Sequence, residues 1–305
     1  MVEGRWVTRM EIVQAPDPAA MVAAQRYAVL QPLIVDKTPL FEWMIQQVTS
    51  SHPAGPARII ELGVGTGGFL EEVVRQRLWL ETTLIGCDCG VAPLAVARER
   101  LAAHGRSAVL CGGVNALDPQ DAFYTHLAAP ASADVVVLSQ FEHYAPNQPE
   151  SRLARRLSEE GRFACSKAAL RRLAASLLRP GGWLFVVDDY AADTPEEQAA
   201  WEAAWDAQVV RDLGEPRVHR KLAAFDPAGA ATLARRYSVD RPLAQRLALV
   251  ARARSRRRHR DFEEIQSLTE AQADFRELFG AGRAGVVAHP ASSSYPQFFL
   301  LWGRL

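Results

Sequence analysis

A glycine-rich segment followed by an aspartate has the residue types needed to bind a nucleotide-like ligand. Gly63, Gly65 and Gly68 come directly after the short apolar run 58–62. Glycines permit a tight turn between a strand and a helix, and they let backbone amides approach a ligand that a Cβ atom would push away. The start of the helix beyond them favours a phosphate or a carboxylate. Asp88 ends the next apolar run, where its carboxylate can hold both hydroxyls of a ribose.

One cofactor that fits these residues is NAD. Gly63, Gly65 and Gly68 satisfy the pattern G-x-G-x-x-G, and Asp88 follows at about the interval expected for that cofactor. A single match of this kind is weak evidence, and a typical NAD-binding sheet runs its strands in parallel. The elements along the rest of the chain therefore decide between this cofactor and others.

Short apolar runs alternate with helical stretches over most of the chain. Nearly all residues of each run are apolar, which predicts strands buried on both faces, and their alternation with helices predicts a doubly wound parallel sheet. The strands are expected at 58–62, 83–87, 108–111, 134–138 and 183–187, and the helices between them at 67–75, 91–104 and 166–178. The last two runs, 285–288 and 296–302, are joined by too few residues for a parallel crossover, so we expect this pair to be antiparallel.

The order of these motifs carries a family resemblance. Glu61-x-Gly63-x-Gly65-Thr66-Gly67 resembles motif I of the class I S-adenosylmethionine-dependent methyltransferases, and Asp88 resembles that family's ribose-binding acid. Residues 114–116 stand where the family often has Gly-Asp-Ala against the adenine, although Asn115 replaces the usual aspartate. Residues 134–140 resemble the fourth strand, and 178–182 are similar to the segment that leads into the fifth. The antiparallel last pair also favours this family over an NAD-binding one.

The resemblance implies S-adenosyl-L-methionine as the cofactor and assigns residues to its site. In many family members an aromatic residue of the N-terminal helical segment covers the cofactor, which Tyr27 could do here, although a tyrosine that packs helices is the alternative. The expected cofactor-binding residues are Tyr27, Glu61, Gly63, Gly65, Gly67, Asp88, Cys89, Asn115, Ala116, Ser139 and Gln140.

The implied reaction is direct displacement of an activated methyl group, in which the protein mainly positions the reactants. A hydroxyl or ammonium acceptor also needs a base, and His143 follows the fourth expected strand, where ligand crevices form. Its alternative role is that of a loop histidine bonded to backbone. We expect Tyr144, Tyr190 and Trp205 to contact the substrate. Trp201 and Trp205 share a helix face, which either lines an acceptor pocket or docks a lid.

The predicted fold is α/β, a Rossmann-like, doubly wound and mostly parallel sheet with an antiparallel C-terminal strand and a helical lid. Residues 1–54 are expected to form a helical arm, 55–190 and 266–305 the core that binds the cofactor, and 191–265 a helical cap over the substrate site. The expected function is methyl transfer to an O or N atom of a small molecule, such as a secondary metabolite. The alternatives are an RNA or protein methyltransferase that uses the arginine-rich run 252–260, and a cofactor-binding scaffold without methyl transfer.

Charge and cysteine content bound the partners. Lys+Arg and Asp+Glu are both 35, and this balance argues against a dedicated nucleic-acid binder. The pair Cys87 and Cys89 lacks the second half of a zinc motif, so we expect no metal site. The sequence shows neither a secretory signal pattern nor an apolar run of membrane-spanning length, so we expect a cytoplasmic protein without membrane contact. The arm before Ala19 could exchange between two copies and give a homodimer.

Overall fold

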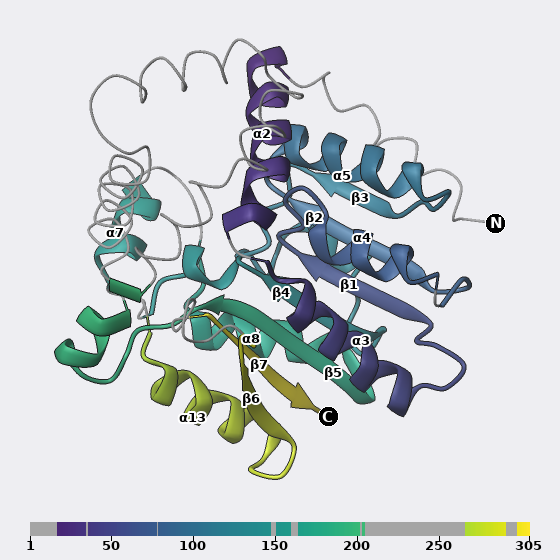
Figure 1. Cartoon of the computed structure of the whole chain (residues 1–305). Helices are drawn as coiled ribbons and strands as arrows, with labels where there is room; N and C mark the ends of the chain where they lie inside the picture. Colours follow the sequence, from purple (N-terminus) through teal and green to yellow (C-terminus); the bar gives the residue numbers. More distant parts are fainter. Residues whose placement is uncertain are drawn as a thin grey trace.

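Seven strands form one central sheet in the computed structural model (Figure 1). The structure describes residues 17–34, 36–77, 79–147, 151–159, 164–201, 203–204, 266–290 and 298–305. The strands are β1 (Arg58–Leu62), β2 (Thr83–Asp88), β3 (Val109–Gly112), β4 (Ala133–Ser139), β5 (Leu178–Asp189), β6 (Ala284–Ala288) and β7 (Phe298–Arg304). Their spatial order is β3-β2-β1-β4-β5-β7-β6. The first five strands run in parallel, whereas β7 pairs with both β5 and β6 in antiparallel fashion.

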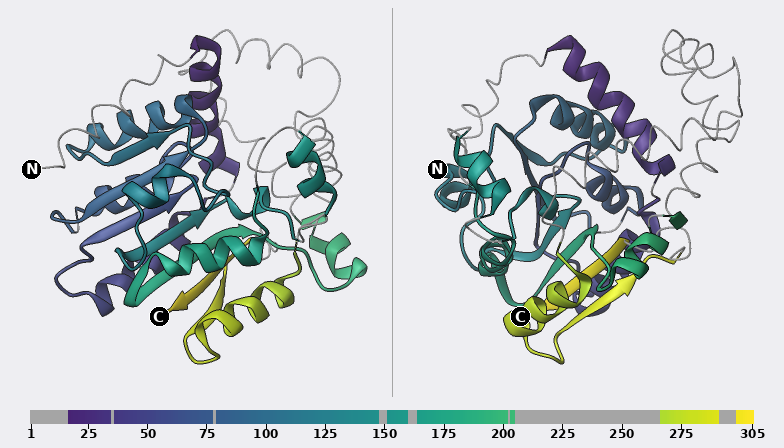
Figure 2. Two further views of the ribbon diagram at one scale, coloured as in Figure 1. Left: turned by 180° about the vertical axis from the view of Figure 1, so that it is seen from behind. Right: turned by 90° about the vertical axis from the view of Figure 1, so that its left-hand side faces the viewer.

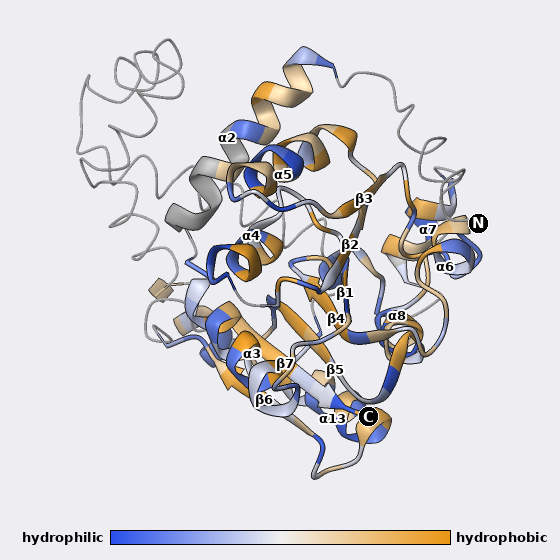
Figure 3. Cartoon of the chain, turned by 90° about the vertical axis from the view of Figure 1, so that its right-hand side faces the viewer, coloured by the Kyte–Doolittle hydropathy of each residue, from blue (hydrophilic) through white to orange (hydrophobic). Residues whose placement is uncertain are grey.

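Helices cover both faces of the sheet, which is why the strands are apolar throughout (Figures 2 and 3). They are α2 (Pro18–Ile34), α3 (Thr38–Ser51), α4 (Gly68–Arg75), α5 (Val91–Ala103), α6 (Ala122–His126), the 3₁₀ turn η1 (Glu142–Tyr144), α7 (Arg152–Glu159), α8 (Lys167–Ser176) and α13 (Leu268–Phe279). Leu40, Phe41 and Met44 of α3 share one hydrophobic core with residues of α4 and α5. Leu170 and Phe275 belong to the core on the other face, to which α6, α8 and α13 contribute.

The strand order reverses between β1 and β4, and this reversal positions the site. The chain winds from β1 to β3 in one direction and then crosses to β4 on the other side of β1. The loops that leave β1 and β4 therefore diverge at the carboxyl ends of these strands. Open α/β sheets bind ligands in the crevice that such a reversal creates.

The expected mostly parallel sheet and its antiparallel last pair are confirmed, and one boundary differs by several residues. The helix expected at 166–178 ends at Ser176, and β5 begins at Leu178 rather than at 183. The Pro-Gly-Gly segment, which indicated a turn, is part of the strand because Gly181 N donates a hydrogen bond to Leu305 O at the end of the chain. Gly181 has a φ of +82°, which a glycine adopts without steric cost.

The region expected to form a cap is described only at its start. Residues 195–201 are helical, and Thr194 Oγ1 accepts a hydrogen bond from Glu197 N at 3.2 Å. Residues 205–265, which include Trp205 and the arginine-rich run 252–260, lie outside the described residues. Within the described part of the chain, no helix has both the length and the apolar character needed to cross a lipid bilayer.

Candidate functional site

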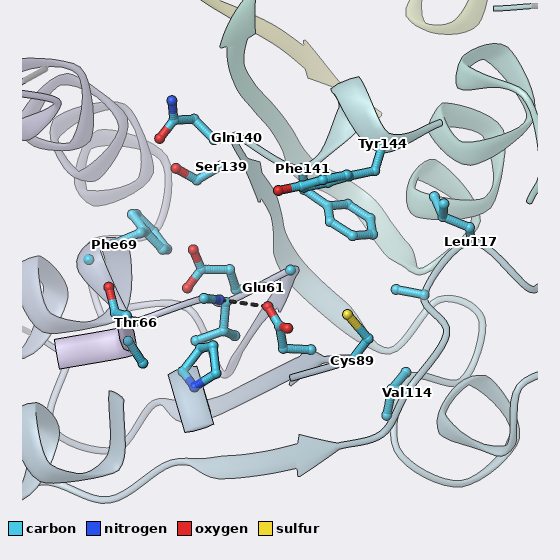
Figure 4. A pocket seen from close by; sticks show the side chains of 18 of the residues that line it. Glu61, Thr66, Phe69, Cys89, Val114, Leu117, Ser139, Gln140, Phe141 and Tyr144 are labelled. Atoms are coloured by element: carbon cyan, nitrogen blue, oxygen red, sulfur yellow. Dashed lines mark hydrogen bonds between the residues drawn. The ribbon is translucent and has the colours of Figure 1, made fainter. Parts of the chain in front are cut away.

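A cavity of about 1090 Å³ opens at the carboxyl ends of β1, β2, β3 and β4 (Figure 4). Its wall is built from the loops that follow these strands, together with parts of α2, α3, α4, α5 and α7. Ten residues expected from the sequence line this cavity: Glu61, Gly63, Gly65, Asp88, Cys89, Asn115, Ala116, Ser139, Gln140 and Tyr144. The fold thus brings residues from four separate loops to one concave surface.

The three glycines after β1 have different structural roles. Gly63, Gly65 and Gly67 all have positive φ, at +73°, +53° and +79°. A Cβ atom on Gly63 would lie 2.3 Å from Phe141 Cδ2, and one on Gly67 would lie 2.8 Å from Ala97 Cβ. A Cβ atom on Gly65 would meet nothing within 4 Å. Gly63 therefore allows the loop after β4 to approach, Gly67 allows α4 to pack on α5, and Gly65 leaves the backbone open to the cavity. Gly67 itself does not line the cavity.

Asp88 fixes the glycine loop as well as facing the cavity. Its Oδ2 accepts a hydrogen bond from Gly65 N at 2.8 Å, drawn as a dashed line in Figure 4, and its Oδ1 accepts from Gly90 N at 2.8 Å. A carboxylate oxygen can accept a second hydrogen bond, so both oxygens remain able to bind a ligand hydroxyl. The exposed thiol of Cys89 lies beside it on the cavity wall.

The wall after β3 combines apolar side chains with one amide. Val114, Ala116 and Leu117 line the cavity together with Asn115. Asn115 N donates to Asp121 Oδ2 at 2.9 Å, and Asn115 Oδ1 accepts from Leu117 N at 3.3 Å. Asp121, which also caps α6, is thus the residue that holds this loop in place, and the sequence analysis did not identify it. The surface has the apolar character and the polar edge that suit a flat heterocycle.

Glu61 lies in the floor of the cavity and is almost fully buried, with 1% of its surface exposed. Its Oε2 atom has no hydrogen-bond partner among the described residues. Burial raises the pKa of this carboxyl from 4.5 to about 8, and the attraction of Lys37 offsets only part of that effect. In Figure 4 the carboxyl group points into the space below Ser139.

Lys37 lines the cavity although it is not among the site residues expected from the sequence. Its Nζ donates to Gln140 Oε1 at 3.0 Å and to Ser139 Oγ at 3.3 Å. Burial lowers the pKa of Lys37 from 10.5 to about 8, against the attraction of Glu61 and other carboxylates. Nothing in the local sequence distinguishes this lysine from a solvated one, because its partners lie more than 100 residues away.

His143 lies beside the cavity but does not line it. Its Nδ1 is 2.9 Å from Asp188 Oδ1, and its backbone N donates to Asp188 Oδ2 at 3.1 Å. The side chain of His143 is 22% exposed, and its ring centroid is 4.2 Å from that of Tyr144, which does line the cavity. Burial alone would raise the pKa of Asp188, but the charge and hydrogen bonds of His143 hold it below its usual value.

The remaining residues that were expected to contact the substrate or to cover the cofactor are not among the described residues of the cavity wall. Tyr190 is buried outside the cavity, with its ring centroid 6.4 Å from that of Phe299. Burial raises the pKa of its hydroxyl well above the usual range. Trp205 and the side chain of Tyr27 lie outside the described residues. Trp201, whose ring centroid is 5.8 Å from that of Phe299, makes a docking contact with β7.

A buried ionic cluster supports the loop that carries His143. Arg171 Nε donates to Glu142 Oε2 at 2.9 Å, and Arg171 Nη2 donates to Oε1 of the same carboxylate. Arg171 Nη1 donates to Asp274 Oδ2 at 2.6 Å. Glu142 therefore has a structural role. Among the described residues, no group of three His, Cys, Asp or Glu side chains is arranged to hold a metal ion.

Comparisons with known proteins place this geometry in a family. A family model described as "Methyltransferase domain" matches residues 46–271. An O-methyltransferase family protein from Burkholderia thailandensis is 18% identical with a TM-score of 0.46, over 98% of this chain and 65% of that chain. A putative O-methyltransferase from Nostoc punctiforme is 12% identical with a TM-score of 0.49, over 98% and 66%. The CurJ carbon methyltransferase is 14% identical with a TM-score of 0.50, over 92% and 57%.

The family model carries the assignment to a family, and the CurJ structure carries the likeness in fold. The chain spans less than two thirds of the length of each of the three solved structures. The comparison with curated proteins found no match. The similarity to CurJ supports the methyltransferase fold, with its mostly parallel sheet and antiparallel last strands. Because the family model covers well over half of the sequence, the chain belongs to the methyltransferase domain family.

Proposed function

We propose that the chain is an S-adenosyl-L-methionine-dependent methyltransferase that transfers a methyl group to an O or N atom of a small molecule. The observation that carries this proposal is the convergence of the Gly65 loop, Asp88, Asn115 and the buried Glu61 on one cavity. Family membership, which implies this cofactor, agrees with the proposal. A volume of about 1090 Å³ leaves room for a nucleoside-sized ligand and a small acceptor together.

The residues present fit S-adenosyl-L-methionine in four places. Asp88 would accept hydrogen bonds from the ribose hydroxyls, and Asn115 with its apolar neighbours would hold the adenine. The open face of Gly65 would let the ligand approach the backbone, because no protein atom occupies the position of a Cβ there. The buried Oε2 of Glu61 needs a hydrogen-bond donor that the described chain does not supply, and leaving it unsatisfied is costly.

S-adenosyl-L-methionine supplies a methyl group on a positively charged sulfur, which leaves as a neutral thioether. The protein has to orient the acceptor, exclude water and take up a proton. Phe141 and Tyr144 line the cavity after β4 and would bound the acceptor space. His143 would take the proton: when Nδ1 donates to Asp188, the lone pair lies on Nε2 and can accept the proton of an acceptor hydroxyl or ammonium.

A second candidate function is cofactor binding without methyl transfer. One observation favours it, namely that His143 does not line the cavity, so that a bound acceptor would have to reach past Tyr144. A transferase whose acceptor needs no base would also fit this arrangement. The RNA or protein alternative rests on residues 252–260, which lie outside the described residues.

Binding of S-adenosylhomocysteine, followed by calorimetry, is the first test. We expect binding to the wild type, no binding of NADH, and an affinity about ten- to a hundredfold lower in Asp88→Ala, the scale of a charged hydrogen bond. Asp193→Ala, an exposed position outside the cavity, is the matched control and should leave the affinity unchanged. Absence of S-adenosylhomocysteine binding, or binding of NADH in its place, would overturn the proposal.

Labelled methyl transfer to a panel of phenols, hydroxy acids and amines separates the two candidates. We expect a labelled product, and His143→Ala should reduce its rate while S-adenosylhomocysteine still binds. Retained binding with no product from any member of the panel would instead favour the scaffold.

A further inference from the structure

Lys37 places a cation in the cavity wall beside the end of β4. Its Nζ donates to Ser139 Oγ at 3.3 Å and to Gln140 Oε1 at 3.0 Å, and it lies 5.6 Å from the centre of the Phe41 ring. An ammonium group has three N–H donors, so one of them is left for a ligand. The described part of the chain provides no third acceptor for that donor.

The backbone that carries Lys37 is anchored from two sides. Leu40 N and Phe41 N each donate to Lys37 O at 3.0 Å, which fixes the residue at the start of α3. His289 is buried just after β6, and its Nε2 donates to Asp36 O at 2.7 Å. The backbone position of the lysine is therefore set before a ligand arrives, which lowers the entropic cost of binding.

No carboxylate among the described residues is close enough to form an ion pair with Lys37. Glu61, Asp188 and Asp189 attract its charge from beyond that distance. Glu61 itself holds a proton near pH 7, because its pKa is about 8. A cation that is partly removed from water is stabilised by an anion in contact with it. An anionic ligand group at this end of the cavity would supply the missing charge.

A separate place exists for the carboxylate of the methyl donor. Among the described residues, no side chain caps the first turn of α4, and Gly68 and Phe69 of that turn line the cavity. Uncapped N–H groups at the start of a helix attract a carboxylate. The donor as a whole carries a net positive charge, and its sulfonium attracts an anionic acceptor. These charges favour the acceptor as the source of the anion that contacts Lys37.

We propose that Lys37 selects a methyl acceptor that carries a carboxylate, by donating its third hydrogen bond to that group. This inference rests on the proposed function and names the class of small molecule that this function would use. The carboxylate is a recognition group, and a hydroxyl or amine elsewhere on the same molecule receives the methyl group. The favoured acceptors are hydroxy acids and amino-substituted acids rather than neutral alcohols.

The arrangement of the cavity wall suits such a molecule. Figure 4 shows Gln140 on one side of the cavity and Phe141 and Tyr144 on the other. A carboxylate bound beside Gln140 lets the apolar body of the acceptor extend along the two rings. Its far end then lies next to Tyr144, whose ring centroid is 4.2 Å from that of His143. The carboxylate and the group that loses a proton would thus be held at opposite ends of the acceptor.

Matched pairs of a carboxylic acid and its primary amide test the charge directly, because the two molecules have nearly the same shape. The pairs are salicylate with salicylamide, 4-hydroxybenzoate with 4-hydroxybenzamide, and anthranilate with anthranilamide. Calorimetry on the protein saturated with S-adenosylhomocysteine keeps the donor site occupied, so these probes report on the acceptor space. We expect the carboxylate of at least one pair to bind the wild type at least tenfold more tightly than its amide.

Two variants of Lys37 and one control locate the source of that preference. Lys37→Met should reduce it to less than threefold, and Lys37→Arg should restore part of it. Both variants should bind S-adenosylhomocysteine within threefold of the wild type, and this result also reports that they are folded. Arg98→Met removes an exposed cation outside the cavity and should keep the full preference.

Absence of a carboxylate preference in the wild type, or its persistence in Lys37→Met, would overturn the inference while leaving the proposed function intact. Loss of the preference in Arg156→Met but not in Lys37→Met would also overturn it, because Arg156 is an exposed cation of α7 that lines the same cavity. A tenfold loss of S-adenosylhomocysteine affinity in Lys37→Met with an unchanged preference would assign the lysine to the donor instead. Failure of the wild type to bind S-adenosylhomocysteine would remove both the inference and the proposed function.

Discussion

Asp188 binds the backbone and the ring of His143 with its two carboxylate oxygens. Oδ2 accepts from the backbone N at 3.1 Å, and Oδ1 lies 2.9 Å from Nδ1. The aspartate side chain is 2% exposed and lies one residue before the end of β5, whereas His143 lies in the turn after β4. One carboxylate therefore fixes the position of that turn and the orientation of its imidazole together, across the carboxyl ends of two neighbouring strands.

Asp188→Asn should lower the free energy of unfolding by about 2 kcal/mol at pH 7, because a charged hydrogen-bond acceptor for three donors is lost. The pKa of Asp188 is held below its ordinary value, so its contribution to stability is present above that value and is lost as the pH falls through the lower, folded-state pKa. The difference in the free energy of unfolding between the wild type and Asp188→Asn should therefore narrow as the pH falls from 5 to 3. Urea unfolding measures this difference.

Asp134→Asn is the matched control for Asp188→Asn. Asp134 Oδ2 accepts from Ala57 N at 2.7 Å and from Arg58 N at 2.9 Å, at the opposite end of β4 from the cavity. Asp134→Asn should lower the free energy of unfolding by a comparable amount. Only Asp188→Asn should also slow methyl transfer, by at least tenfold, to the acceptor that the panel of phenols, hydroxy acids and amines identifies. Equal rates in the two variants would contradict the orienting role of Asp188.

Gly65→Ala should reduce the affinity for S-adenosylhomocysteine at least tenfold while the protein stays folded. The φ of +53° costs a residue with a Cβ atom about 1 kcal/mol, and the new Cβ would meet no protein atom within 4 Å. It would instead occupy the space through which a ligand reaches the backbone. Calorimetry measures the affinity, and thermal unfolding measures the strain.

Gly105→Ala separates backbone strain from obstruction of the cavity. Gly105 has a φ of +69°, a Cβ there would also meet nothing within 4 Å, and the residue does not line the cavity. Both variants should lose similar stability, but Gly105→Ala should bind S-adenosylhomocysteine normally. If Gly65→Ala bound the ligand as tightly as this control does, the glycine loop would not be part of the site.

The sequence predicts those features of the site that depend on local pattern. Apolar runs and glycine spacing predict the parallel strands near the site and the placement of Gly65 and Asp88 on one cavity, because a strand, its following turn and the next helix are close in sequence. Lys37 could not be found in this way, since its partners Ser139 and Gln140 are about 100 residues away and meet it only when α3 packs on the sheet. Gly67 matched the motif although the structure uses it for helix packing against Ala97.

Arg171→Met should be among the most destabilising single substitutions in the described core. The guanidinium is 1% exposed and neutralises Glu142, which is equally buried, so its removal leaves a carboxylate without compensation. Breaking a buried pair in this way costs about 3–5 kcal/mol. Arg172→Met, at the exposed neighbouring position, should change the free energy of unfolding by less than about 0.5 kcal/mol. Urea unfolding measures both.

The double variant Arg171→Met/Glu142→Gln tests the cause of that loss. Replacing the unpaired carboxylate of Glu142 should recover part of the lost stability, because burying a neutral amide costs less free energy than burying an unpaired carboxylate. A double variant less stable than Arg171→Met alone would mean that the packing of the arginine stem, rather than its charge, holds the η1 turn.

Glu61→Gln should stabilise the ligand-free protein, and increasingly so as the pH rises. With a folded-state pKa of about 8 against 4.5, Glu61 keeps a proton in the folded protein that the unfolded chain has already lost. The free energy of unfolding of the wild type therefore falls as the pH rises from about 4.5 to about 8, by at most about 1.4 kcal/mol for each pH unit from this group. Glutamine does not titrate, so urea unfolding at pH 5, 6.5 and 8 should show a growing advantage for the variant. Glu72→Gln is the contrasting control, since Glu72 is paired with Arg75 at 2.6 Å and its loss should destabilise the protein. An advantage of Glu61→Gln that stays constant with pH would mean that the cavity carboxyl is already ionised in the folded protein.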